Sequence, residues 1–179
     1  MPDHDTPGYD EFGLFQDNAS EAGLTWSGPP TVRRRHAEIA PDRRVSALQW
    51  GAGEPDLVLL HGGAQNAHTW DTVALALDRP LLAVDLPGHG HSDWWPRHDY
   101  TPHNLAAAVA AARNELAPEP TPVVGMSLGG LTALRLAAAD PESVSRLILV
   151  DVTPGAGDNP GKTAAITAFV NGPVDFDSF

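Results

Sequence analysis

One segment of this chain, residues 123–139, constrains its fold more than any other. A short apolar run ends in Gly-Met-Ser-Leu-Gly at 125–129, and a helical pattern starts at once. A serine placed between a strand and a helix in this way is the sequence form of a nucleophile elbow. We expect backbone strain to push the hydroxyl of Ser127 out of the sheet, with the flanking glycines leaving room where side chains would collide. The segment therefore predicts a strand, a sharp turn and a helix.

Other parts of the chain repeat this alternation of strand and helix. Apolar runs typical of strands buried on both faces of a sheet lie at 56–61, 81–85 and 146–151. Helical patterns cover 67–78 and the residues after Thr101 and Pro102, a good N-cap and first-turn pair. Residues 31–39 and 43–51 predict an antiparallel hairpin with a Pro-Asp turn. The pattern predicts an α/β fold with a mostly parallel sheet.

Composition excludes several classes of function. The 179 residues contain no cysteine, which rules out disulfides, a thiol nucleophile and thiolate metal sites. The net charge of −12 argues against nucleic acid as a partner. His89 and His91 alternate as metal ligands can, but no third ligand lies at local spacing, so we expect no metal.

The sequence shows no membrane segment. It contains no signal peptide, and no apolar run approaches the ~20 residues that a membrane span needs. We expect a cytoplasmic protein with no membrane partner, and the oligomeric state stays open.

The chain divides into three parts by composition. Residues 1–30 are polar and are interpreted as an N-terminal arm in which 10–22 could form a short helix. Residues 31–153 hold the predicted core. The pattern changes after it, and residues 154–179 are interpreted as the start of a lid or cap segment. The three arginines at 33–35 lie in a predicted strand, where we expect an exposed and charged sheet edge.

Four short motifs lie at the ends of the predicted strands: His-Gly-Gly at 61–63, Asp-Leu-Pro-Gly-His-Gly-His-Ser at 85–92, Gly-Met-Ser-Leu-Gly-Gly at 125–130 and Leu-Val-Asp at 149–151. In this order and spacing they resemble the α/β-hydrolase fold family. The stretch from about residue 31 to 153 is similar to the N-terminal two-thirds of its catalytic core. The resemblance implies a three-layer α/β/α sandwich, truncated at its C-terminal end. It also implies a cofactor-free serine hydrolase that acts on ester-like or other acyl bonds of a small molecule through an acyl-enzyme.

The resemblance also assigns roles to particular residues. Ser127 would be the nucleophile, and the backbone N–H groups of Leu128 and Gly63 would form the oxyanion hole. His61 would hydrogen-bond within its turn and serve structure rather than catalysis. Some members of the family place the catalytic acid at the position of Asp151, so this residue is a candidate acid. The alternative, which we favour, is that Asp151 ties down the loop that follows.

The catalytic histidine is the missing part. Members of the family carry their catalytic residues in the order Ser, then Asp or Glu, then His. All the histidines of this chain precede Ser127, at 4, 36, 61, 68, 89, 91, 98 and 103. The interpretation we favour is that the chain is a fragment and that the histidine lies in missing C-terminal sequence. A non-catalytic small-molecule binding module and a partner chain that donates the base are the alternatives.

Overall fold

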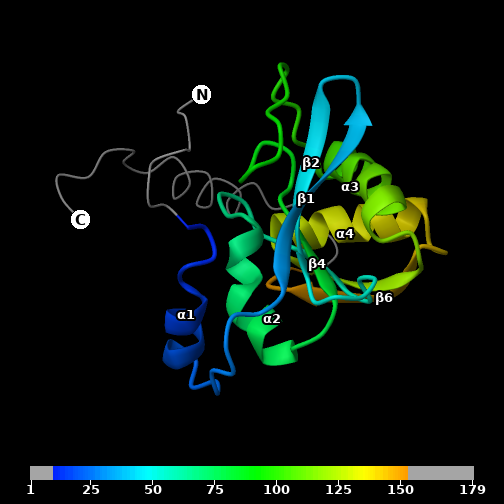
Figure 1. Cartoon of the computed structure of the whole chain (residues 1–179). Helices are drawn as coiled ribbons and strands as arrows, with labels where there is room; N and C mark the ends of the chain where they lie inside the picture. The colour runs from blue at the N-terminus through cyan, green and yellow to red at the C-terminus, as the bar shows by residue number, and fades with distance from the viewer. Residues whose placement is uncertain (1–9, 153–179) are drawn as a thin grey trace.

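The computed structural model describes residues 10–152, and these residues form a six-stranded sheet with helices on both faces (Figure 1). The strands are β1 (Val32–Ala40), β2 (Arg43–Trp50), β3 (Val58–Leu60), β4 (Leu81–Val84), β5 (Thr121–Met126) and β6 (Val144–Val150). Their order across the sheet is β1-β2-β4-β3-β5-β6. Strands β4, β3, β5 and β6 are parallel, while β2 pairs antiparallel with both β1 and β4. The mostly parallel sheet predicted from the sequence is confirmed.

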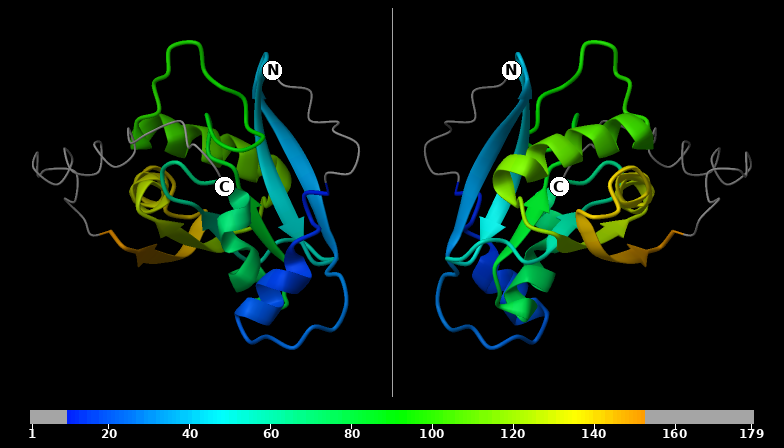
Figure 2. Two further views of the ribbon diagram at one scale, coloured as in Figure 1. Left: turned by 90° about the vertical axis from the view of Figure 1, so that its left-hand side faces the viewer. Right: turned by 90° about the vertical axis from the view of Figure 1, so that its right-hand side faces the viewer.

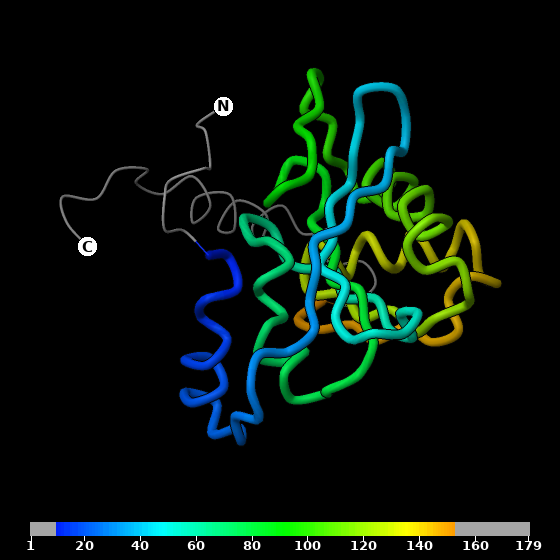
Figure 3. Tube along the Cα trace, viewed as in Figure 1, coloured from blue at the N-terminus to red at the C-terminus, as the bar shows by residue number. Residues whose placement is uncertain are grey.

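Strands β1 and β2 form the predicted antiparallel hairpin. The register pairs Val32 with Trp50, and the turn between the strands places Asp42 at a φ of 57°. The tip of the hairpin lies beside the segment that follows β4, where the carbonyl of Arg44 accepts a hydrogen bond from the amide of Asp93 at 3.1 Å (Figure 3). The hairpin therefore extends the sheet and also braces the turn after β4.

The helices form two outer layers. They are α1 (Phe15–Glu21), the 3₁₀ helix η1 (Ala67–Trp70), α2 (Asp71–Leu77), α3 (Pro102–Leu116) and α4 (Leu128–Ala139). Helices α1, η1 and α2 cover one face of the sheet, and α3 and α4 cover the other (Figure 2). Alternate residues of β3 serve the two faces: Val58 and Leu60 join the core under α3 and α4, while Leu59 joins the core on the opposite face. This is the expected three-layer α/β/α sandwich.

Helix α3 begins as the sequence predicts. The Thr101 hydroxyl oxygen accepts a hydrogen bond from the amide of Asn104 at 3.4 Å, and Pro102 occupies the first turn. This cap satisfies one of the amide groups that a helix start leaves without a partner. The buried face of the helix then packs on α4 and on the hairpin.

The predicted helix over 67–78 is wrong in part. The segment begins as the 3₁₀ helix η1, and the α-helix starts only at Asp71. Trp70 and Ala74 are buried as expected, but Val73 and Leu77 of the same predicted stripe are exposed. The spacing of apolar residues identifies the side of a helix that faces the protein. It does not show how much of that side neighbouring elements cover.

The expectation of an exposed charged edge at 33–35 is also wrong for one residue. β1 is indeed an edge strand, yet the Arg34 side chain is only 11% exposed and forms ion pairs with Glu11 and Asp85. The described part of the N-terminal arm is likewise more than a surface segment. Helix α1 buries Phe15 and Ala19, packs on α2 and places the Phe15 ring against Trp50 of β2. The boundaries at residues 30 and 153 remain predictions.

Strand β6 forms the other edge of the sheet. Ile148 is 43% and Val150 is 38% exposed, and within residues 10–152 no strand pairs with the outer side of β6. Among the described residues, β6 therefore presents apolar side chains at an unpaired edge of the sheet. None of the helices in this part of the chain is long and apolar enough to cross a membrane.

Candidate active site

Four parallel strands end at the same edge of the sheet, and the chain leaves each of them at one of the four sequence motifs. The register pairs Leu60 with both Val84 and Gly125, and Met126 with Val150. The residues that follow these strands are His61, Asp85, Ser127 and Asp151. The fold thus brings together motifs that are far apart in the sequence. Ligand sites of open α/β sheets lie at this carboxyl edge of the strands.

Ser127 occupies the sharp turn between β5 and α4. Its φ of 48° and ψ of −112° are unfavourable for a residue with a side chain, at a cost of about 1–3 kcal/mol. The amide of Ser127 donates to the carbonyl of Val150 at 3.0 Å, and its own carbonyl accepts from the amide of Leu131 at 3.0 Å. Within residues 10–152 the Oγ atom has no hydrogen bond. The backbone is therefore fixed while the hydroxyl is left unengaged.

The flanking glycines allow this turn because backbone passes close to them. A Cβ atom added to Gly125 would collide with the carbonyl of Gly129, and one added to Gly129 would collide with the carbonyls of Leu60 and His61. These contacts are with backbone, which cannot move aside as a flexible side chain can. Helix α4 therefore starts directly against β5 and the end of β3.

Gly63 and Leu128, the residues expected to supply the oxyanion donors, follow the neighbouring strands β3 and β5. A Cβ atom added to Gly63 would stand 4.0 Å from Cδ2 of Leu128. The amide of the neighbouring Gly62 donates to Oε1 of Gln65 at 2.8 Å, which holds the turn after β3. Within the described residues, neither the Gly63 amide nor the Leu128 amide donates a hydrogen bond to the protein. Leu128 also opens helix α4, where the helix dipole favours negative charge.

His61 has the structural role that the sequence predicts. The ring is fully buried, Nδ1 donates to the carbonyl of Gly62 at 2.7 Å, and Nε2 accepts from the amide of Leu86 at 3.0 Å. The Leu86 amide can only donate, so the ring proton is assigned to Nδ1. Burial lowers the pKa of His61 to about 4. Because both ring nitrogens are engaged, His61 cannot act as the base for a nucleophile.

The turn after β4 contains His89 and His91. The His89 ring lies 5.1 Å from the His61 ring, and its Nδ1 donates to the carbonyl of Pro87 at 3.1 Å. Among residues 10–152, no group of three or more His, Asp or Glu side chains could hold a metal ion.

Asp151 lies next to Ser127 in space but is not joined to it. It directly follows β6, is exposed, and adopts a φ of 54°. Its carboxylate has no hydrogen bond or ion pair with the described residues. The structure therefore places the two residues on neighbouring strand ends without linking their side chains. The predicted lid or cap segment at 154–179 lies outside the described residues.

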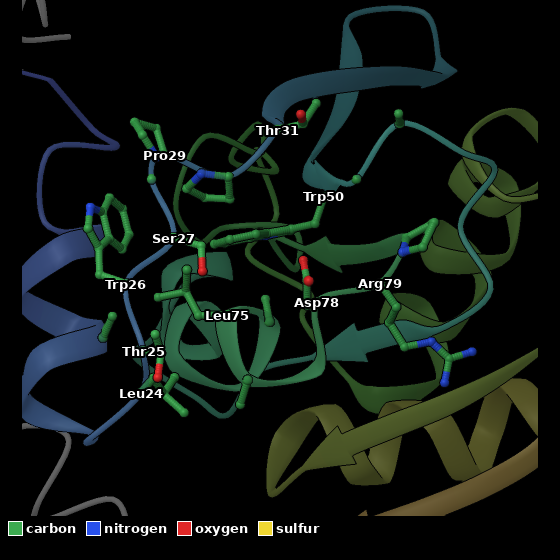
Figure 4. A pocket seen from close by; sticks show the side chains of 18 residues that line it. Leu24, Thr25, Trp26, Ser27, Pro29, Thr31, Trp50, Leu75, Asp78 and Arg79 are labelled. Atoms are coloured by element: carbon green, nitrogen blue, oxygen red, sulfur yellow. The ribbon is translucent and has the colours of Figure 1, made fainter.

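One cavity lies away from these residues. It has a volume of about 660 Å³ and is lined by Trp26, Trp50 and Pro80, among others (Figure 4). Trp50 pairs with Leu81, the first residue of β4, so the cavity is at the amino edge of that strand. It is therefore on the opposite edge of the sheet from Ser127.

Comparisons with known proteins agree with this geometry. Residues 55–166 match the family described as alpha/beta hydrolase fold. The chain is 47% identical over 184 residues to the esterase Rv0045c of Mycobacterium tuberculosis, covering all of this chain and 59% of that protein. It is 42% identical over 115 residues to the pimeloyl-[acyl-carrier protein] methyl ester esterase of Edwardsiella ictaluri, covering 62% of this chain and 42% of that enzyme.

Solved structures extend the likeness to three dimensions. The structure of the M. tuberculosis esterase Rv0045c superposes with a TM-score of 0.80 at 48% identity, covering 96% of this chain and 58% of that chain. The chain therefore spans about three-fifths of this relative and less than half of the pimeloyl ester esterase.

Proposed function

Because the chain belongs to the alpha/beta hydrolase fold family, we propose that it carries the nucleophile half of an esterase site. The observation that carries the proposal is the geometry of Ser127. Its backbone is held at a φ of 48° between β5 and α4, its Oγ is unengaged, and the amides of Leu128 and Gly63 have no hydrogen-bond acceptor among the described residues. This arrangement suits attack on an acyl carbon, and both named relatives are esterases.

In the proposed reaction, Oγ of Ser127 attacks the carbonyl carbon of an ester, and a base takes the hydroxyl proton. The amides of Leu128 and Gly63 donate hydrogen bonds to the oxyanion that forms. Collapse of this intermediate breaks the carbon–oxygen bond, releases the alcohol with a proton from the base, and leaves an acyl-enzyme. Water then attacks the acyl group, returns the proton to Ser127 and releases the acid.

The proposal needs a histidine from outside the described core. His61 is engaged at both nitrogens, and no histidine follows Ser127 in these 179 residues. We assign the base to sequence of the kind that the longer relatives possess beyond the matched region. Asp151 is the candidate carboxylate to orient that histidine. The alternative role, fixing the loop after β6, is separated from this one by the Asp151→Asn variant, which lowers kcat only in the first case.

The test uses an extended chain, defined as these 179 residues followed by the residues that come after the matched region in the M. tuberculosis esterase. Hydrolysis of p-nitrophenyl esters of increasing acyl length is measured for this chain and for its Ser127→Ala variant. We expect the substitution to lower kcat by at least about 10³-fold. Ser145→Ala, at an exposed serine of β6 outside the site, is the matched control and should leave kcat unchanged.

Two results would contradict the proposal. Retained hydrolysis by Ser127→Ala would mean that another group is the nucleophile. A folded extended chain that binds esters but hydrolyses none of them would support the binding-module alternative instead.

A further inference from the structure

We propose that Arg34 is a positioning residue for the oxyanion hole, acting through Asp85 on the turn that carries Gly63, with Glu11 of the N-terminal arm fixing the Arg34 guanidinium. This inference rests on the proposed function, because it assigns a purpose to the turn after β3. The residues involved come from the N-terminal arm, β1, β2 and the segments that follow β3 and β4 at the carboxyl edge of the sheet.

Asp85 is the centre of the arrangement. Its side chain is buried, and Oδ1 accepts a hydrogen bond from the amide of Ala67 at 2.7 Å. Oδ2 accepts from Nη1 of Arg34 at 2.7 Å and from the amide of His91 at 3.2 Å. A Cβ atom added to Gly90 would collide with this carboxylate, so the turn after β4 wraps closely around it. One carboxylate thus ties the turn after β3 to the turn after β4.

Arg34 compensates the buried charge of Asp85 and fixes its direction. Nη1 also donates to Oγ of Ser46 at 2.6 Å. On its other side the guanidinium donates from Nη2 to Oε2 of Glu11 at 2.6 Å and from Nε to the same oxygen at 2.9 Å. A guanidinium held by a carboxylate on each side has little freedom to rotate, since its donors form a rigid planar fork.

Glu11 brings the N-terminal arm into this network. Burial alone would raise the pKa of Glu11, but the hydrogen bond and the positive charge of Arg34 outweigh it and lower the pKa below its usual value. The arm is also held by packing, because Phe15 lies in the core with its ring 4.8 Å from that of Trp50. His68, whose Nδ1 donates to Asp71 at 2.8 Å, places Nε2 3.5 Å from the Glu11 carboxylate.

The network reaches the amide of Ala67, four residues after Gly63, the proposed oxyanion donor. The turn from Gly62 to Ala67 is held near its start by Gln65, and at its end by the bond from Ala67 to Asp85. Loss of Arg34 would leave the Asp85 carboxylate buried without its counter-charge. We expect that carboxylate to turn toward water and release the Ala67 amide. The Gly63 amide would then lose the fixed aim on which oxyanion stabilisation depends.

Two measurements on Arg34→Met test the proposal. In the 179-residue chain, hydrogen exchange at the Ala67 amide should accelerate by about 10-fold or more, while exchange in α3 and α4 stays unchanged. In the extended chain, kcat should fall by about 10- to 100-fold with KM changed by less than about threefold. Arg34→Lys keeps the charge and should recover part of both losses. Arg79→Met, which breaks the exposed ion pair with Asp56 at 2.6 Å, is the control and should change neither.

Other outcomes would overturn the proposal. An unchanged exchange rate at Ala67 would show that Arg34 does not hold the turn. Faster exchange at Ala67 with unchanged kcat in an active extended chain would show that the network only stabilises the fold. If Arg34→Met also accelerates exchange in α3 and α4, the milder Glu11→Gln variant decides, and it must accelerate exchange at Ala67 alone.

A failure of the proposed function is distinguishable from these outcomes. In that case the wild-type extended chain hydrolyses no ester, while the exchange experiment still reports whether Arg34 and Asp85 hold the turn.

Discussion

Asp85 and Asp151 occupy corresponding places in the fold and have opposite surroundings. Each directly follows a parallel strand at the carboxyl edge of the sheet, Asp85 after β4 and Asp151 after β6. Asp85 is buried and accepts hydrogen bonds from Arg34, Ala67 and His91. Asp151 is exposed and has no hydrogen bond or ion pair with residues 10–152.

The difference follows from the position of the two strands. β4 lies inside the sheet, between β2 and β3, and donors reach its end from β1, from η1 after β3 and from its own following turn. β6 has one neighbour among the described residues, β5, and the end of that strand contributes only the strained turn at Ser127. The same residue type is therefore an internal anchor in one place and an available carboxylate in the other.

The largest expected effect is a difference in protein stability between substitutions at Asp85 and at Asp151. Asp85→Ala leaves Arg34 buried without one of its partners and two backbone amides unpaired, and should reduce the free energy of unfolding by about 3–5 kcal/mol. Asp151→Ala is the matched control and should change it by less than about 0.5 kcal/mol. Urea unfolding of both variants checks this. Similar losses for the two variants would remove the distinction.

The second prediction concerns His61, the buried group beside the Asp85 turn. Its pKa is about 4 in the folded protein and 6.5 in the unfolded chain, so the unfolded state takes up the proton first as the pH falls. The contribution of neutral His61 to stability is complete above pH 6.5 and declines toward pH 4, by as much as about 3 kcal/mol.

The difference in unfolding free energy between wild type and His61→Asn measures this contribution. It should be largest near neutral pH and should shrink toward pH 4, because the variant has no ring to protonate. A difference that stays constant with pH would contradict the assignment of His61 as a buried neutral group.

The third prediction tests backbone strain at Ser127, in the turn between β5 and α4. Ser127 holds a φ of 48°, which glycine adopts without cost. Ser127→Gly should therefore be more stable than Ser127→Ala by about 1–2 kcal/mol, as measured by thermal unfolding. Equal stability of the two variants would show that the turn is not strained.

The smallest expected effect on stability is at the outer side of β6. Ile148→Lys replaces an apolar side chain that is 43% exposed and should change the free energy of unfolding by less than about 1 kcal/mol. It should nevertheless reduce self-association of the 179-residue chain, measured by light scattering over a concentration series. If self-association is undiminished, a surface other than the outer side of β6 causes it.

The sequence predicts those features whose determinants are local. The hairpin, the apolar strands and the cap at Thr101 lie within a few residues of the expected positions, because each depends on a short pattern of polarity and turn residues. The strand–serine–helix turn is likewise a local motif, and the glycines around it make the expected close contacts.

The sequence does not predict features that depend on distant partners. The burial of Arg34 requires Glu11 and Asp85, which lie 23 and 51 residues away in the chain. The run of three arginines does not show which of them pairs with a distant carboxylate. The packing of Phe15 on Trp50 is not predictable for the same reason, since the partner ring lies in a strand far along the chain.

Covalent labelling shows whether Ser127 is the nucleophile. The extended chain is treated with a fluorophosphonate, and the modified residue is located by mass spectrometry. If Ser127 is the nucleophile and its base lies outside these 179 residues, as proposed, we expect a label on Ser127 in the extended chain, none in its Ser127→Ala variant, and much slower labelling of the 179-residue chain. A label on another residue, or equal labelling of the Ser127→Ala variant, would contradict the proposal.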